Sequence, residues 1–148
     1  MSNNYTQFSV GIEFDNMAEH DWWLAMLREA AEYQEDEYYE AQYLTDDIKE
    51  LIYQYGGIGF EYDIGKASII CYSEECGYLE VLTEMAREFL RKFQPKGCLS
   101  FEAVNTCSKP RVGEFGGYGY FITKDDIHFH SVFDWLRNQE IAHKEWNK

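Results

Sequence analysis

The chain has 148 residues, of which 45% are hydrophobic, 18% are aromatic and two are proline. This composition suits one folded domain with a hydrophobic core, and it excludes a disordered or fibrous protein. The formal net charge is -14 at pH 7, which excludes direct binding to a nucleic acid or an anionic membrane, because both need clustered lysine and arginine.

The N-terminal region predicts a strand followed by a long helix. Apolar and polar residues alternate over 9–15, which is typical of a strand with one side in water. Asn16 is a suitable N-cap, and Glu19 three residues later completes a capping box. Apolar residues then recur at helical spacing over 17–41, with a break in the pattern near 34–37.

A second helix and a hairpin are predicted next. Thr45 can cap the first turn of this helix, and Gly56 and Gly57 can end it in the left-handed conformation. Alternating apolar residues over 58–64 and 66–72 predict two strands joined by a glycine-containing turn.

The C-terminal half predicts a mixture of helices and strands. The elements expected there are a helix over 79–93, strands over 99–103 and 118–123, and a helix over 131–139. Phe133 and Leu136 are expected inside the protein. The element order predicts an α+β fold, a single domain over 1–148 with a largely antiparallel sheet and three to four helices packed on one face.

Acidic residues are distributed unevenly along the chain. Residues 1–65 hold 15 acids and two bases, whereas residues 66–148 hold 12 acids and 11 bases. Like charges four residues apart on a helix, with no base between them, destabilise that helix in isolation. We therefore predict a partner-binding surface that a cationic protein neutralises. Its residues are Glu29, Glu32, Glu35, Asp36 and Glu40 on the first helix, with Glu13, Asp15, Glu61 and Asp63 near the strands.

This surface suggests a function in protein interaction. Carboxylates about 5–6 Å apart along a helix approximate the spacing of phosphates in a nucleic-acid strand. The hypothesis is an acidic interaction protein, a nucleic-acid mimic that occupies the groove of a basic nucleic-acid-binding protein. The simpler alternative is a solvated surface that only keeps the chain soluble. Exposed aromatic residues would equally allow a homodimer.

A glycine-rich stretch over 113–120 carries a second hypothesis. Gly116 and Gly117 permit close approach of the backbone to a ligand, and Arg111 and His128 lie nearby in the sequence. This alternative is a small-molecule-binding protein or an enzyme with its site within 109–130. The stretch lacks the Lys-Ser/Thr pair of a phosphate-binding loop and precedes a strand, so a bulge or tight turn explains the glycines equally well.

We predict no catalytic residue, metal or cofactor from the motifs. The four cysteines, spaced unlike a zinc ribbon, are Cys71, Cys76, Cys98 and Cys107. His128 and His130 would share a face if they lay on a strand, but no third ligand can be assigned. Neither a Ser-His-Asp nor an H-E-x-x-H pattern occurs. Residues 1–7 lack the basic and apolar regions of a secretory signal, so we expect a cytoplasmic protein. The lack of a catalytic motif favours a binding protein over an enzyme, which stays the alternative.

One part of the sequence resembles known proteins. The segments are Gly113-Glu114-Phe115-Gly116-Gly117, Phe121-Ile122-Thr123, Asp125-Asp126-Ile127 and Phe133-Asp134-Trp135-Leu136. They resemble a stretch in small proteins encoded by phages and plasmids, over about a fifth of the chain. The resemblance implies a mobile genetic element and carries no catalytic residue. Because such elements encode acidic inhibitors of restriction and CRISPR systems, it adds a host nuclease to the expected partners.

Overall fold

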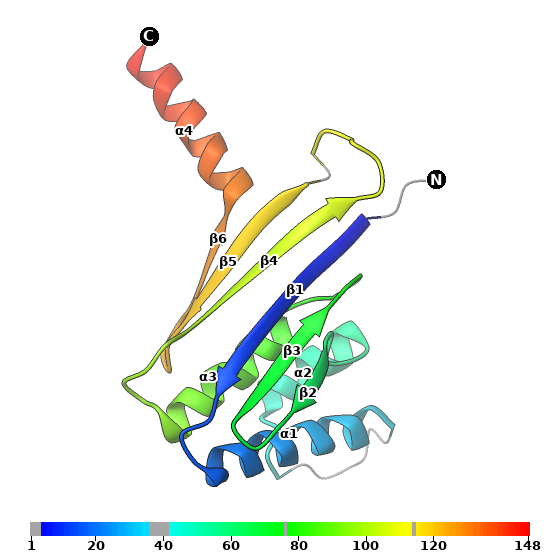
Figure 1. The fold of residues 1–148 in the computed structure, drawn as a ribbon. Coiled ribbons are helices and arrows are strands. Elements are labelled where there is room, and N and C mark those ends of the chain that lie inside the picture. The colour runs from blue at the N-terminus through cyan, green and yellow to red at the C-terminus, as the bar shows by residue number, and fades with distance from the viewer. Residues whose placement is uncertain (1–3, 36–41, 76, 114) are drawn as a thin grey trace.

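The computed structural model describes residues 4–35, 42–75, 77–113 and 115–148. Figure 1 shows an α+β fold in which one six-stranded sheet is accompanied by four helices. In chain order the elements are β1 (Asn4–Glu13), α1 (Met17–Glu35), α2 (Asp46–Tyr55), β2 (Glu61–Ile64), β3 (Ser68–Ser73), α3 (Glu80–Phe93), β4 (Leu99–Cys107), β5 (Gly116–Ile122), β6 (Ile127–Ser131) and α4 (Val132–Trp146).

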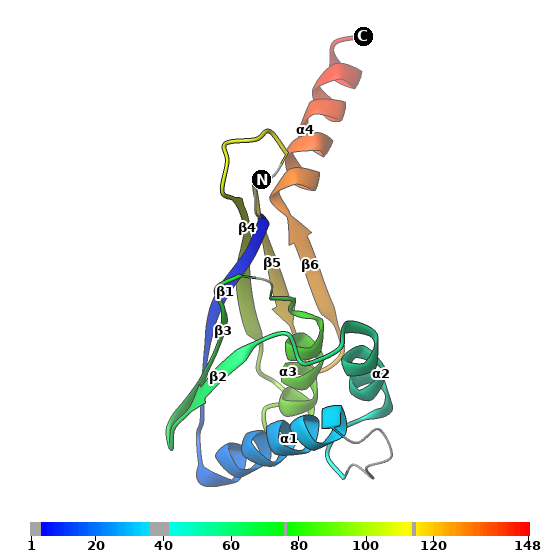
Figure 2. The same cartoon turned by 90° about the vertical axis from the view of Figure 1, so that its right-hand side faces the viewer.

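The sheet has the strand order β2-β3-β1-β4-β5-β6, and every neighbouring pair is antiparallel. Because side chains alternate along a strand, each residue that points to one face is followed by one that points to the other. Val10 pairs with Cys71, and Ile12 pairs with Ile69, and all four side chains are buried on the same face. We call this the helix face, because α1, α2 and α3 lie against it (Figure 2). The opposite face, which we call the open face, is covered by no helix in the described parts of the chain.

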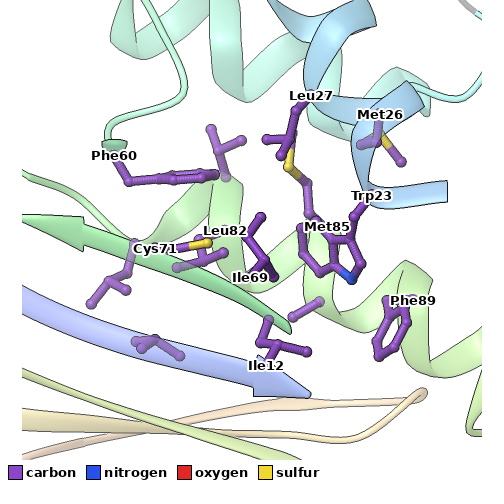
Figure 3. Packing of buried hydrophobic residues seen from close by; sticks show 14 of the residues in the cluster. Ile12, Trp23, Met26, Leu27, Phe60, Ile69, Cys71, Leu82, Met85 and Phe89 are labelled. Atoms are coloured by element: carbon purple, nitrogen blue, oxygen red, sulfur yellow. The ribbon is translucent and has the colours of Figure 1, made fainter. Parts of the chain in front are cut away.

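The hydrophobic core lies between the helix face and the three helices. Figure 3 shows Ile12 and Ile69 of the sheet facing Met85 of α3 and Trp23 of α1. All four side chains are 0–1% exposed. The Trp23 and Phe89 rings pack with their centroids 5.7 Å apart. Each large apolar side chain buried in this way contributes about 1.5–3 kcal/mol to folding, so this layer holds the helices on one face.

Local signals fix the start of each of the first two helices and the end of the second, as the sequence predicted. The Asn16 side chain accepts a hydrogen bond from the Glu19 N–H at 3.1 Å, and the Glu19 carboxylate accepts one from the Asp15 N–H. Thr45 accepts a hydrogen bond from the Ile48 N–H at 3.2 Å. Gly56 ends α2 with a φ of 74°, a left-handed conformation that glycine adopts without steric cost.

Three predictions about the elements need correction. Strand β6 was missed, because Thr123 and Asp126 suggested the start of a helix. The Thr123 hydroxyl instead accepts hydrogen bonds from the N–H groups of the next turn, which joins β5 to β6. The last helix is longer than expected, and Phe133 and Leu136 are 63% and 50% exposed rather than inside. The strand expected from residue 58 begins at Glu61.

The described part of α1 stops at Glu35. The prediction that the first helix runs on to residue 41 falls partly on residues 36–41, which lie outside the described part of the chain. Within the described residues, no helix is both long enough and apolar enough to cross a membrane.

Candidate functional site

The strand acids come together on the open face of the sheet. Glu61 and Asp63 are exposed on β2, and Glu13 is exposed on β1. The register places all three on the open face: Glu61 is level with Tyr72, Asp63 with Ile70, and Glu13 with Ser68. The sequence prediction that these carboxylates face away from the core is confirmed.

Glu29 does not lie on the protein surface, which corrects its place in the predicted partner-binding set. It is 6% exposed, and its carboxylate faces into the protein rather than the solvent. One carboxylate oxygen, Oε1, accepts hydrogen bonds from the backbone N–H of Tyr43 at 2.7 Å and of Leu44 at 3.0 Å. Glu29 therefore anchors the segment that enters α2. A buried backbone N–H group needs a hydrogen-bond acceptor. The stabilisation from these two hydrogen bonds outweighs the hydration that the Glu29 carboxylate would gain in solvent.

The other acids of this set are spread over different parts of the protein. Glu32 is exposed on α1, which lies on the helix face and not on the open face. Asp15 is exposed in the turn between β1 and α1, where it accepts a 3.3 Å hydrogen bond from the Gln94 side chain. The side chain of Glu35, together with Asp36 and Glu40, lies outside the described residues. The partner-binding surface expected from the sequence is therefore divided between two faces.

A hollow at the end of the β2–β3 hairpin extends the acidic surface. It measures about 410 Å³ and is lined by Gly59, Phe60, Glu61, Ser73, Glu74 and Glu75. The Gln7 side chain donates a 2.9 Å hydrogen bond to the Glu74 carbonyl, which ties this segment to β1. Three carboxylates around one hollow form a suitable receptor for a lysine or arginine side chain. We refer to Glu13, Glu61, Asp63, Glu74 and Glu75 together as the acidic face.

The carboxylates of the acidic face raise the pKa of a neighbouring tyrosine. Asp63 raises the pKa of the Tyr72 hydroxyl above its ordinary value, and partial desolvation, Glu61 and Glu74 raise it further. The phenolate is disfavoured because its negative charge would lie beside three carboxylates. This shift indicates a negative potential over β2 and β3.

Among the described residues, no lysine or arginine forms an ion pair with the acidic face. The six strands contain no lysine or arginine, and Lys66 lies in the turn between β2 and β3. In the described parts of the chain, the ion pairs of lysine and arginine join residues three apart, within one helix or at the end of α4. The carboxylates of the acidic face take part in none of these pairs, so their charge is available to a partner.

Sequence reasoning missed Glu74 and Glu75. They follow β3 directly, and they line one hollow with Glu61 only because β2 and β3 form a hairpin. The pair Glu74-Glu75 after an apolar strand is visible in the sequence, but that signal does not tell which distant residues lie next to it.

The glycine-rich segment does not assemble the second predicted site. Gly116 and Gly117 lie at the start of β5, whereas His128 pairs with Phe121 near the other end of that strand. Arg111 lies in the connection between β4 and β5. A hollow of about 460 Å³ near this connection is lined by none of the four predicted residues. The structure thus spreads these four residues over both ends of β5 and the connection before it.

The sequence predicts no metal site at the cysteines or histidines. The described cysteines, Cys71, Cys98 and Cys107, are free thiols, and burial raises the pKa of Cys71 to about 12. His128 and His130 do share the open face of β6. No group of three or more potential ligands for a metal occurs among the described residues.

Comparison with known proteins adds no relative: no family model, no curated protein and no solved structure matches the chain. The proposals below therefore depend on the geometry and charge of the protein itself.

Proposed function

We propose that this chain is an acidic interaction protein whose acidic face binds a lysine- and arginine-rich protein surface. The observation that carries the proposal is the set of unpaired carboxylates on a sheet without lysine or arginine. A cationic surface neutralises this field on binding, and complementary charge speeds the encounter of the two proteins.

The hollow beside Glu61 provides a point of specific contact. Its volume of about 410 Å³ accommodates one long cationic side chain between Glu61, Glu74 and Glu75. An arginine there makes paired hydrogen bonds to a carboxylate, which are stronger than those between neutral groups. Carboxylates at the exposed rim contribute less, about 0.2–1 kcal/mol each.

The finer proposal is that the partner binds nucleic acid and that the acidic face takes the place of its phosphates. Glu61 and Asp63 are two residues apart on one strand, a separation of about 7 Å. That distance is of the same order as the charge spacing of a nucleic-acid strand, which carries one charge per about 3.4 Å of helix axis. The resemblance to phage and plasmid proteins supports a restriction or CRISPR nuclease as the partner, which the protein would inhibit.

A matched pair of variants tests the proposal. The first, E13Q/E61Q/D63N, removes three charges from the acidic face, and the control, D21N/D47N/E50Q, removes three exposed charges from α1 and α2. We expect the unmodified chain and the control to capture a basic protein from a bacterial lysate at low salt and to release it at high salt. We expect the first variant to capture it poorly.

The captured protein is then purified with labelled duplex DNA bound, and the chain is added as a competitor. Release of the DNA by the unmodified chain supports mimicry. Equal capture by both variants, or capture that salt does not weaken, contradicts the acidic interaction. A captured protein that binds no nucleic acid contradicts mimicry alone.

A further inference from the structure

In the described residues, helix α4 contacts its own chain at its N-terminal end, where Val132 lies beside Gly117 of β5. It continues from β6 and projects beyond the sheet, with the C-terminus at its far end (Figures 1 and 2). None of its 15 residues is buried. An isolated helix of this length is marginal in water, because helices in proteins gain most of their stability from packing an apolar face. Helix α4 therefore requires a covering surface.

Five of the seven apolar residues of α4 form one stripe, and Phe133 and Ile141 lie outside it. The stripe consists of Val132, Trp135, Leu136, Ala142 and Trp146, which at 100° per residue fall within an arc of about 120°. Trp135 is 49% exposed and Trp146 is 88% exposed. The stripe presents about 500 Å² of apolar surface per copy, given the size of such side chains. A stable interface buries about 800 Å² per partner, of which a little over half is apolar.

A hollow lies at the base of the stripe. It measures about 270 Å³, and its lining includes Val104, Gly117, Gly119, His130 and Val132. A Cβ atom at Gly117 would lie 3.6 Å from the Val132 side chain, so the hollow and the stripe are continuous. Because glycine has no side chain, Gly117 and Gly119 leave this space on the open face unfilled. Since a cavity of about 150 Å³ accepts benzene, this hollow is large enough for an indole ring.

A second copy of α4 complements the stripe when it runs antiparallel about a two-fold axis at Gln139. In this register Val132 of one copy lies level with Trp146 of the other, and Leu136 lies level with Ala142. A large side chain thus meets a smaller one at both positions, as close packing requires. Trp146 also reaches the level of the hollow beside Val132 of the other copy.

Charge favours a second copy at this place. Residues 132–148 carry three acids and three bases, whereas the whole chain has a net charge of -14. Two copies can therefore meet here without the repulsion that their acidic regions would produce.

We infer that two copies of this chain form an antiparallel dimer through α4, with Trp146 of each copy seated in the hollow beside Val132 of the other. β2 and β6 are the two opposite edges of the sheet, so the acidic face stays free in the dimer. One particle then presents two acidic faces, which strengthens binding to a partner with two basic surfaces.

Sedimentation velocity over a concentration series tests the dimer with the full chain. We expect a monomer–dimer equilibrium that Trp146→Ala and Gly117→Val each weaken at least about tenfold, because buried tryptophans dominate interface energy. Both positions are accessible in the monomer, and circular dichroism confirms that the variants fold. Tyr53→Ala, at a tyrosine that is 76% exposed on α2, is the control and is expected to leave the dimer unchanged. A monomer at every concentration, larger assemblies, or equal effects of all three variants overturns the inference.

Cysteine cross-linking tests the register. Gln139→Cys places two thiols at the two-fold axis, and mild oxidation is expected to give a covalent dimer. Arg137→Cys, on the opposite side of the helix from the stripe, is expected to give none, and the unmodified chain controls for the native cysteines. Equal cross-linking at both positions, or none at residue 139, overturns the antiparallel register.

Discussion

Replacement of Glu29 by alanine separates a structural carboxylate from a partner-binding one. The change removes the acceptor of two backbone hydrogen bonds, from Tyr43 at 2.7 Å and Leu44 at 3.0 Å. The N–H group of Leu44 is buried, so water does not replace the lost acceptor without local opening of the structure. We expect the segment before α2 to loosen and the free energy of unfolding to fall.

The size of the loss follows from the contacts. A hydrogen bond to a charged group contributes about 1.5–3 kcal/mol, and a buried donor left without an acceptor costs about 1–3 kcal/mol. Because the Tyr43 N–H is only partly buried, we expect a total of about 3 kcal/mol. For a chain of this length, that loss lowers the melting temperature by about 6–12 °C.

Thermal unfolding followed by circular dichroism measures the effect. Glu32→Ala is the control, because Glu32 is exposed on the same helix and a surface substitution changes stability by about 0.5 kcal/mol or less. Glu29→Gln keeps one acceptor oxygen and is expected to fall between the two. Equal melting temperatures for the two alanine variants would refute the reasoning, and Glu29 would return to the set of candidate partner-binding residues.

Three other outcomes are expected. Asp63→Asn lowers the Tyr72 pKa toward its ordinary value, because Asp63 is the largest cause of the raised pKa; NMR of labelled tyrosine rings measures this, and an unchanged pKa argues against a negative potential. Burial raises the pKa of Cys71 from 9.0 to about 12, so Cys71 resists alkylation at pH 9 while the exposed Cys98 reacts, and equal labelling of the two contradicts the burial. The free energy of unfolding falls as pH rises from 9 to 12, because the Cys71 thiol loses its proton at a lower pH in the unfolded state than in the folded state. Gly59→Ala destabilises the fold, because φ is 82° there and a Cβ would overlap a tyrosine ring; an unchanged melting temperature contradicts this.

The two proposals use different parts of the molecule and stand independently. The acidic face lies on β1, β2 and the segment after β3, whereas the dimer uses α4 and the adjoining ends of β5 and β6. A dimer without a basic partner, or a basic partner bound by a monomer, leaves the other proposal intact. In the proposed dimer, the glycine-rich segment contributes to the interface, because Gly117 and Gly119 line the hollow beside Val132.

The sequence by itself determined the local structure and the class of fold. The start of each of the first two helices and the end of the second follow from Asn16, Thr45 and Gly56, since each acts on hydrogen bonds within a few residues. The period of apolar residues revealed the helix α3 and the hairpin of β2 and β3 for the same reason, because a face toward the core needs only a repeating pattern. The excess of acids was also readable directly, as charge needs no structure to be counted.

Only the tertiary structure decided where each acid faces and which acids are neighbours. Glu29 is buried because a segment 14 residues further on needs an acceptor, and the chain must fold before that need exists. Glu74 and Glu75 join Glu61 through a hairpin, and α1 lies across the sheet from them. The exposure of α4 likewise depends on β6, whose turn at Thr123 uses the same residue types as a helix start. The same local residue types can start a helix or form a turn between strands, and long-range packing determines which of the two forms.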